Sequence, residues 1–212
     1  MSGSDATKPG AGASGAGAGT GAIPGYDYGT NRSAVSPVTE EELRHLEEAA
    51  GWTAGEAALL RKHEELFRTH ASEMVDSWRG RIAKQRELAQ YFFGPDGKPD
   101  EFYKSRARER FVRWVVDVAV RPHDRDWLNY QEEIGLRHTP ARKNAADGTH
   151  TPALVPLRYF IGFIPMVLPV EQFFAGDIQD AAELHALQRA WTASLLLHVS
   201  LWVRPYAVPG LW

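Results

Sequence analysis

The chain has 212 residues, of which 43% are apolar and 11% aromatic, and this is enough for one domain with a hydrophobic core. Its formal net charge of −3 gives no strong electrostatic attraction to nucleic acid or to anionic lipid, so neither is expected as a partner. The absence of cysteine excludes disulfides, thiolate metal sites and cysteine nucleophiles, and it suits a cytoplasmic protein.

The first segment, residues 1–22, consists almost wholly of glycine, alanine, serine and threonine, with no side chain that could anchor a core. We therefore predict a disordered tail, and because no apolar stretch is followed by a cleavage site, we expect no secretory signal. The composition changes at residues 23–29, "IPGYDYG", where an isoleucine and two tyrosines stand among turn residues. This segment has apolar groups to bury and should lie over the body of a single folded domain, residues 23–212.

Two helix starts follow. Thr39 and Thr53 are each followed three residues later by a glutamate, Glu42 and Glu56, and this spacing is typical of a capping box. The helical pattern continues to a loop rich in glycine and proline at residues 92–100.

Residues 102–120 are predicted to form an amphipathic helix. One face carries apolar side chains and the adjacent stripe carries charges. The apolar face consists of Ala107, Phe111, Trp114 and Val118, and the polar stripe of Arg106, Arg110, Arg113 and Asp117.

Two apolar segments, residues 155–174 and 178–204, are predicted as the last long helices. Pro165 in the first removes one backbone hydrogen bond and should kink it. The second is apolar on two sides, so it is either central or shared with a partner subunit. The longest apolar run, residues 159–170, is too short to span a bilayer and contains two prolines. Since no segment alternates with period two, we predict an all-α protein with about seven or eight helices.

The histidines show no pair with the spacing of a zinc site, and His198, within "LLLHVSLW", is expected to be a buried core histidine with a hydrogen-bond partner. His138 differs from the others in its position. Trp127, Gln131, Ile134 and His138 share one face of a predicted helix, which must stop at Thr139 because a proline follows.

A histidine at a helix end can donate its Nδ1–H to a backbone carbonyl, and its Nε2 then remains free as an acceptor or ligand. A single inward histidine among aromatic residues suits a haem, whose porphyrin supplies four nitrogens itself. Spacing alone leaves a structural role for His138 and haem ligation both open.

The order and spacing of several motifs resemble the protoglobin family, single-domain globins related to the sensor domains of globin-coupled sensors. These motifs are "IPGYDYG", "DSWRGR", "RFVRWVVD", "WLNYQEEIGLRH", "RKN", "PLRYFIGFI" and "SLWVRPY". The resemblance runs from about Ile23 to the C-terminus. It implies a globin fold with an additional N-terminal helix, a haem b bound through a proximal histidine, and an N-terminal segment that helps to bury the haem. It also implies a homodimer formed mainly by the last two long helices.

The resemblance assigns residues to the haem site. In the "LRH" motif His138 matches the proximal ligand of the iron. The positions that line the distal side in the family are occupied by Trp78, Arg79, Phe111, Phe163 and Val167. Arg110, on the polar stripe, is predicted either to meet a haem propionate or to be an ordinary surface arginine.

Arg79 departs from the family, which usually has a tyrosine at this position. A guanidinium has five donors but carries a permanent charge, and burying it unpaired costs free energy. It either turns outward to solvent, a propionate or a carboxylate, or it points inward and favours anionic ligands. We expect the outward orientation. Thr139 also departs, since a second histidine often follows the proximal one.

These observations favour a haem b globin that reversibly binds the diatomic gases O2, CO and NO at a His138-ligated iron, in gas sensing or scavenging. An alternative is a haem enzyme on the same scaffold, with peroxidase-like, NO dioxygenase, nitrite reductase or carbene-transfer activity. A third hypothesis, a helical interaction module without haem, predicts a colourless dimer.

Overall fold

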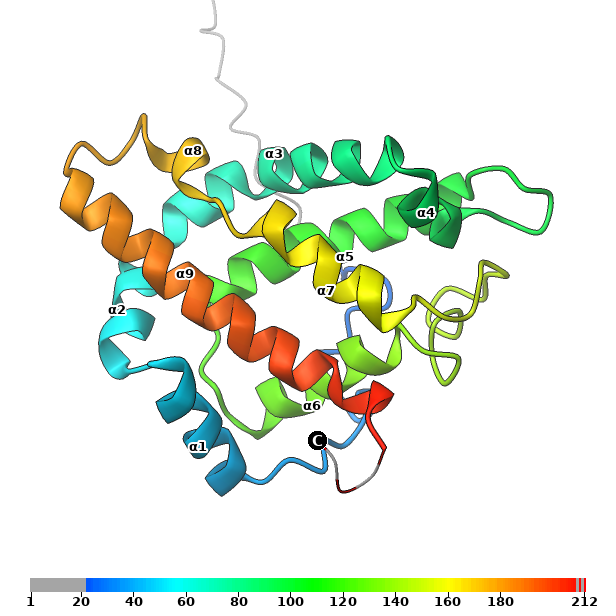
Figure 1. Ribbon diagram of the computed structural model, residues 1–212, viewed down its shortest axis with the longest axis horizontal. Coiled ribbons are helices and arrows are strands. Elements are labelled where there is room, and N and C mark those ends of the chain that lie inside the picture. Colours follow the sequence, from blue (N-terminus) through cyan, green and yellow to red (C-terminus); the bar gives the residue numbers. More distant parts are fainter. Residues whose placement is uncertain (1–21, 209, 211) are drawn as a thin grey trace, which may run out of the picture.

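The computed structural model describes residues 22–208, 210 and 212, so the predicted disordered tail lies outside the described residues except for Ala22. The helices are α1 (Glu40–Ala50), α2 (Ala54–Lys62), α3 (Glu64–Ala83), α4 (Arg86–Ala89), α5 (Glu101–Val120), α6 (Arg125–Leu136), α7 (Leu157–Val167), α8 (Glu171–Phe174) and α9 (Ala181–Trp202), with 3-10 turns at Gln90–Phe92 and Arg204–Tyr206 (Figure 1). Within the described residues the one β-type pairing is an isolated bridge between Phe93 and Pro99, which confirms the all-α class.

Side-chain caps fix where several helices begin. Both predicted capping boxes are present: Thr39 caps α1 together with Glu42, and Thr53 caps α2 together with Glu56. Aspartates cap three of the other helices, because each carboxylate accepts a hydrogen bond from a backbone N–H of the first turn. These are Asp100 on α5, Asp124 on α6 and Asp180 on α9.

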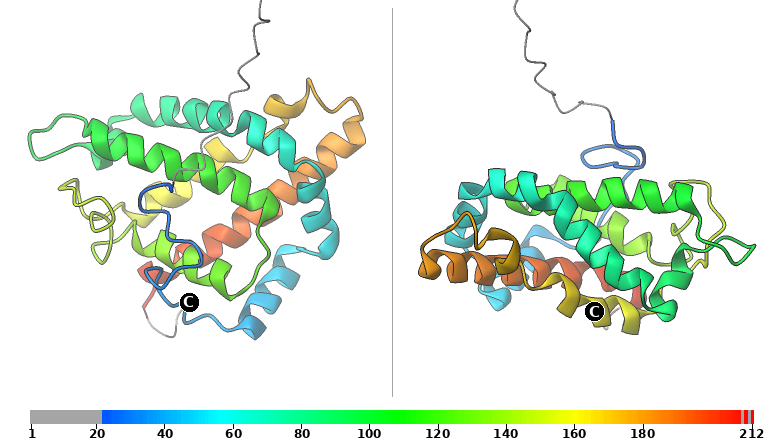
Figure 2. Two further views of the ribbon diagram at one scale, coloured as in Figure 1. Left: turned by 180° about the vertical axis from the view of Figure 1, so that it is seen from behind. Right: turned by 90° about the horizontal axis from the view of Figure 1, so that it is seen from above.

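The helices form two layers. Figure 2 shows α7 and α9 on one side of the molecule and α5 on the other, where residues 22–38 also lie. Trp191 of α9 occupies the middle of the core, stacked on Phe67 at 5.6 Å and on Trp78 at 6.3 Å between ring centroids. Its indole Nε1 donates to the Val167 carbonyl at 2.9 Å, and this bond ties α9 to the end of α7.

His198 is a core histidine, as predicted. Its side chain is 1% exposed, and Nδ1 lies 2.7 Å from the Ser194 carbonyl of the preceding turn. The ring meets Trp127 edge to face at 5.1 Å, so it packs α9 against α6.

The prediction of one kinked helix over residues 155–174 is wrong. Pro165 lies inside α7, but the chain leaves the helix after Val167 and resumes as α8. Pro169 is the reason, because it lacks an N–H and disfavours helical geometry at Leu168. The side chain of Gln188 fills the break: its amide accepts from the Val170 N–H at 2.8 Å and donates to the Leu168 carbonyl at 2.7 Å. The 18-residue stretch Leu157–Phe174 is apolar enough to cross a membrane by composition, with 17% of it buried, but this break divides it.

The helix that carries His138 also ends earlier than predicted. α6 stops at Leu136, and His138 lies in the turn that follows. In a continued helix the Ile134 carbonyl would accept from the backbone N–H of His138. Instead the imidazole Nδ1 lies 2.8 Å from that carbonyl, while the backbone N–H bonds the Gly135 carbonyl at 3.1 Å and tightens the last turn.

Gly135 sets how closely α6 approaches the end of α9. A Cβ at this position would lie 2.8 Å from the Trp202 carbonyl and 3.1 Å from Cγ of Pro205. Because the first of these is a backbone atom, the two helices would have to separate.

We expect Gly135→Ala to lower the free energy of unfolding by about 1–3 kcal/mol, the range for overpacking a close contact. Gly80 of α3 is the matched control, since nothing lies within 4 Å of a Cβ added there. Gly80→Ala should raise stability by about 0.5–1 kcal/mol through helix propensity alone. Urea unfolding followed by far-ultraviolet circular dichroism measures both, and equal shifts in the two variants would contradict the close contact.

Candidate functional site

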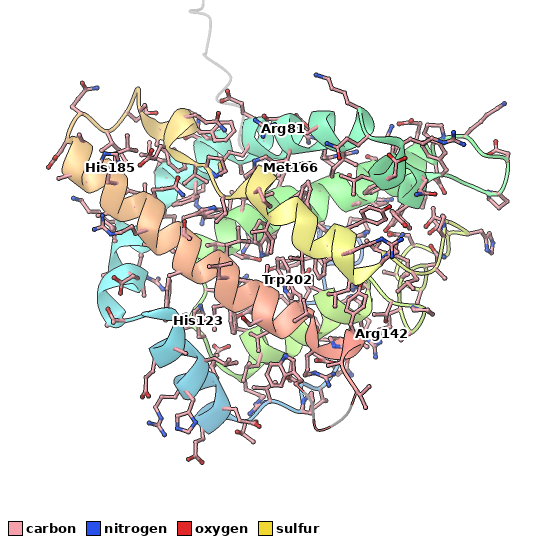
Figure 3. The ribbon with its side chains drawn as sticks, in the orientation of Figure 1. Arg81, His123, Arg142, Met166, His185 and Trp202 are labelled. Carbon is pink, nitrogen blue, oxygen red and sulfur yellow. The ribbon has the colours of Figure 1, made fainter. Side chains whose placement is uncertain are left out.

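A cavity of about 270 Å³ lies between α3, α5, α6, α7 and α9. Its wall is largely apolar, and aromatic residues make up much of it. They include Phe111, Trp114, Tyr159, Phe160, Phe163 and Trp202. Figure 3 shows Trp202 pointing from the last turn of α9 into the space beside α7. Such a wall excludes water from a bound ligand and offers flat surfaces on which a planar ligand can stack.

The structure brings most of the predicted site residues together. His138, Arg79, Arg110, Phe111, Phe163 and Val167 all line this cavity. Trp78 does not: its side chain is fully buried one layer behind the wall, 5.4 Å from the Phe111 ring and against Trp191. Trp78 therefore supports the position of Phe111, and its predicted part in haem binding stays a prediction.

His138 is held from both sides. Its ring lies 4.4 Å from the ring of Phe160 and is inclined to it by 20°. Its backbone carbonyl accepts from the N–H of Val155 at 2.9 Å and from the hydroxyl of Tyr206 at 3.1 Å. The imidazole therefore has little freedom to turn.

The imidazole of His138 is neutral, because burial lowers its pKa to about 4. Since the Ile134 carbonyl can only accept, the proton of the neutral ring resides on Nδ1, and Nε2 carries the lone pair. Within the described residues Nε2 has no hydrogen-bond partner. This is the protonation state that binds a metal ion.

Two arginines that line the cavity, Arg110 and Arg137, are paired with carboxylates. Arg110 makes a bidentate ion pair with Asp147, at 2.9 and 2.6 Å, and also donates to the Pro24 carbonyl at 3.0 Å. Arg137 pairs with Glu133 and Asp27, both at 2.8 Å. The predicted alternatives for Arg110, a propionate or a surface position, did not include this ion pair.

The segment "IPGYDYG" lies over the folded body, as predicted, against α5 and α6. The Arg137 guanidinium donates to the Gly25 carbonyl at 2.5 Å. The Tyr26 hydroxyl donates to Asp117, a buried carboxylate of α5, and burial raises the pKa of Tyr26 to about 12. The Tyr26 ring meets Tyr130 of α6 edge to face at 5.1 Å. Residues 23–29 are therefore tied to both helices that flank the cavity.

Lys143 was not among the predicted site residues, although it belongs to the "RKN" motif. Its side chain is buried, lines the cavity, and directs Nζ at three neutral oxygens: the Tyr103 hydroxyl at 2.8 Å, Thr151 Oγ1 at 2.9 Å and the Tyr91 carbonyl at 3.1 Å. Among the described residues no carboxylate lies within 4 Å of Nζ. Burial lowers the pKa of Lys143 to about 8. At neutral pH it is thus a positive charge without a counter-ion.

Arg79 is the second such charge. It lines the cavity from α3 and is half-buried, and in the part of the chain that the structure describes no carboxylate lies within 4 Å of it. Burial, and then repulsion from Arg108, lower the pKa of Arg79. No carboxylate of the described residues meets Arg79, so its predicted outward orientation, to solvent or to a propionate, stays a prediction.

The residues present fit an iron porphyrin. A flat apolar macrocycle suits the aromatic wall, a neutral imidazole with a free Nε2 suits the iron, and carboxylate substituents suit an uncompensated buried cation. None of these groups alone is specific, but the cavity combines all three.

Comparison with known proteins agrees with this chemistry. The family model described as Protoglobin matches residues 39–211. Among solved structures the chain is similar to the globin domain of the Geobacter sulfurreducens globin-coupled sensor, with 14% identity and a TM-score of 0.63. The match covers 78% of this chain and 97% of that domain, and it confirms the predicted globin fold. No curated protein sequence matches the chain.

Proposed function

The chain belongs to the protoglobin family and is a globin-type haem protein, and from this premise we propose that it holds haem b through His138 and reversibly binds O2, CO or NO, in gas sensing or scavenging. One observation carries the proposal. The lone pair on Nε2 of His138 lies at the wall of an aromatic cavity, and the ring that carries it is fixed by the Ile134 carbonyl.

When bound, the haem supplies an iron with an open coordination position for a diatomic ligand. The protein supplies the surroundings. The hydrogen bond to Ile134 keeps the proton on Nδ1 and raises the basicity of Nε2. Phe111, Phe163 and Val167 exclude water from the part of the cavity that α3, α5 and α7 enclose.

We assign the haem carboxylates to Lys143 and not to Arg110. Arg110 makes a bidentate ion pair with Asp147, whereas the ammonium of Lys143 donates only to neutral oxygens and lies over the Tyr103 ring at 4.3 Å. A carboxylate beside Lys143 would neutralise a buried charge, and this favours binding more than a further contact with a paired arginine.

The first prediction concerns the iron ligand. His138→Ala should lower the affinity for haem by about tenfold or more and change the visible spectrum, because it removes the axial nitrogen. Added imidazole should restore much of the original spectrum, since the cavity left by the ring can hold it. His45→Ala, an exposed position on α1, is the control and should leave haem content and spectrum unchanged.

The outcome is read from haem content after purification and from the ferrous and ferrous–CO spectra. An unaltered spectrum in His138→Ala would falsify the proposed ligand. A wild-type chain that stays colourless with added haem would support the interaction module without haem.

A second prediction tests Lys143. The wild type should bind iron protoporphyrin IX about tenfold or more tightly than its dimethyl ester, since the ester cannot neutralise the buried ammonium. Lys143→Met keeps the apolar stem but removes the charge, so most of this preference should disappear. Lys98→Met, in an exposed loop, is the matched control and should keep it. Titrations followed at the Soret band measure the affinity of each of the three proteins for both porphyrins, and a preference that survives in Lys143→Met contradicts the assignment.

We further propose that the protein is a homodimer joined through α7 and α9. Both helices expose large apolar side chains, Ile161 with 48% and Leu196 with 45% of its surface accessible. The stretch from Leu157 to Phe174 is 17% buried although it is strongly apolar. A second copy would cover this face, whereas the break at Pro169 makes it a poor membrane span.

The third prediction follows from this. The double variant Ile161→Asp/Leu196→Asp should be a monomer in light scattering coupled to size-exclusion chromatography, because the interface would have to bury four carboxylates. Val35→Asp, at a position with 81% of its surface exposed and outside both helices, should remain a dimer of 23.6 kDa chains. A wild type that elutes as a monomer at micromolar concentration contradicts the proposal.

A further inference from the structure

Arg79 carries a positive charge that no carboxylate of the described residues meets within 4 Å. Asp76, an acidic residue that acts on Arg79, is already held by Arg108 in a bidentate pair at 2.7 and 2.6 Å. Glu101 acts on Arg79 only at longer range, and Arg108 repels it. A guanidinium remains charged at any pH the protein survives, so the cavity keeps this charge permanently.

The position of Arg79 sets it apart from the other cations of the cavity. In Figure 1, α3, which carries Arg79, and α6, which leads to His138, lie on opposite sides of α5. Ile82 of α3, Phe111 of α5, and Phe163 and Val167 of α7 line the same cavity with apolar side chains. In contrast, Arg110 and Arg137 have carboxylate partners, and Lys143 has three oxygens around it.

An unbalanced cation in an apolar wall attracts negative charge more strongly than the same cation in water, because few dipoles screen it. A neutral diatomic gas gains little binding free energy from this attraction, because it carries no net charge. A small anion gains both the Coulomb attraction and a charge-assisted hydrogen bond from the guanidinium.

We propose that Arg79 makes the part of the cavity opposite His138 a binding site for a small monoanion, so that the bound haem discriminates in favour of anionic ligands. This inference rests on the proposed haem binding. The ligand class is a monoanion of two to four atoms or a halide, such as azide, formate, nitrite or fluoride. The charge of the ligand, and not its size, is what the site selects.

The experiment compares anionic and neutral ligands on the haem-loaded full chain. The ferric protein is titrated with azide and fluoride, and the ferrous protein with CO, at constant ionic strength and followed by the visible spectrum. Arg79→Gln should lower the ratio of azide affinity to CO affinity by about tenfold or more, equivalent to about 1.4 kcal/mol. Arg79→Lys keeps the charge and should keep most of the ratio.

Arg81→Gln is the matched control. Arg81 is exposed on the same helix, outside the cavity (Figure 3), so its removal changes the net charge equally without touching the site. It should leave all three affinities within about threefold of the wild type, since exposed charges are well screened. Arg79→Met is measured beside Arg79→Gln, so that a folding defect of one variant does not decide the result.

The experiment distinguishes a failure of the proposed function from a failure of the anion site. A wild type that binds neither haem nor CO contradicts the proposed function. A wild type that binds CO, but whose azide-to-CO and fluoride-to-CO ratios change no more in the Arg79 variants than in Arg81→Gln, overturns the anion site alone.

Discussion

The hydrogen bond between Nδ1 of His138 and the Ile134 carbonyl is the contact on which the rest of the site depends. Its donor is the side chain of His138, in the turn that follows α6, and not the backbone N–H that a continued helix would use. It also places the proton on one nitrogen and leaves the lone pair of the other for the cavity. One hydrogen bond thus fixes the tautomer of the ring and with it the nitrogen that a ligand can meet.

Charge is distributed unevenly around the cavity. Arg110 and Arg137, on the α5 and α6 side, form ion pairs and also bond residues 24–27, so they stabilise the fold around the cavity. Lys143 and Arg79 have no such partners among the described residues. The wall therefore combines fixed pairs, which maintain its shape, with two unbalanced charges that are available to a ligand. Whether a cation has a carboxylate partner therefore separates the two groups more clearly than the burial of its side chain does.

Several parts of this arrangement were predictable from sequence. Capping boxes depend on residues three positions apart, so the sequence alone was enough to predict Thr39 and Thr53 as helix caps. The inward position of His138 followed from helical spacing. Lys143 could not be recognised, because its burial depends on a loop folding against Tyr103 from a different helix. The ion pair of Arg110 with Asp147, and the two bonds that Gln188 makes at the break after α7, likewise join residues far apart in sequence.

The ties between the N-terminal segment and the two arginines have a consequence for rates. A planar molecule that passes the cavity on this side must first break the bonds to the Pro24 and Gly25 carbonyls, while α5 and α6 remain folded. Its residence time is then governed by the free energy of a local opening and not by that of global denaturation. Changes at Pro24 and Gly25 can therefore alter how long a pigment is retained, whereas changes at Val38, a core residue of the same segment, also alter the stability of the fold.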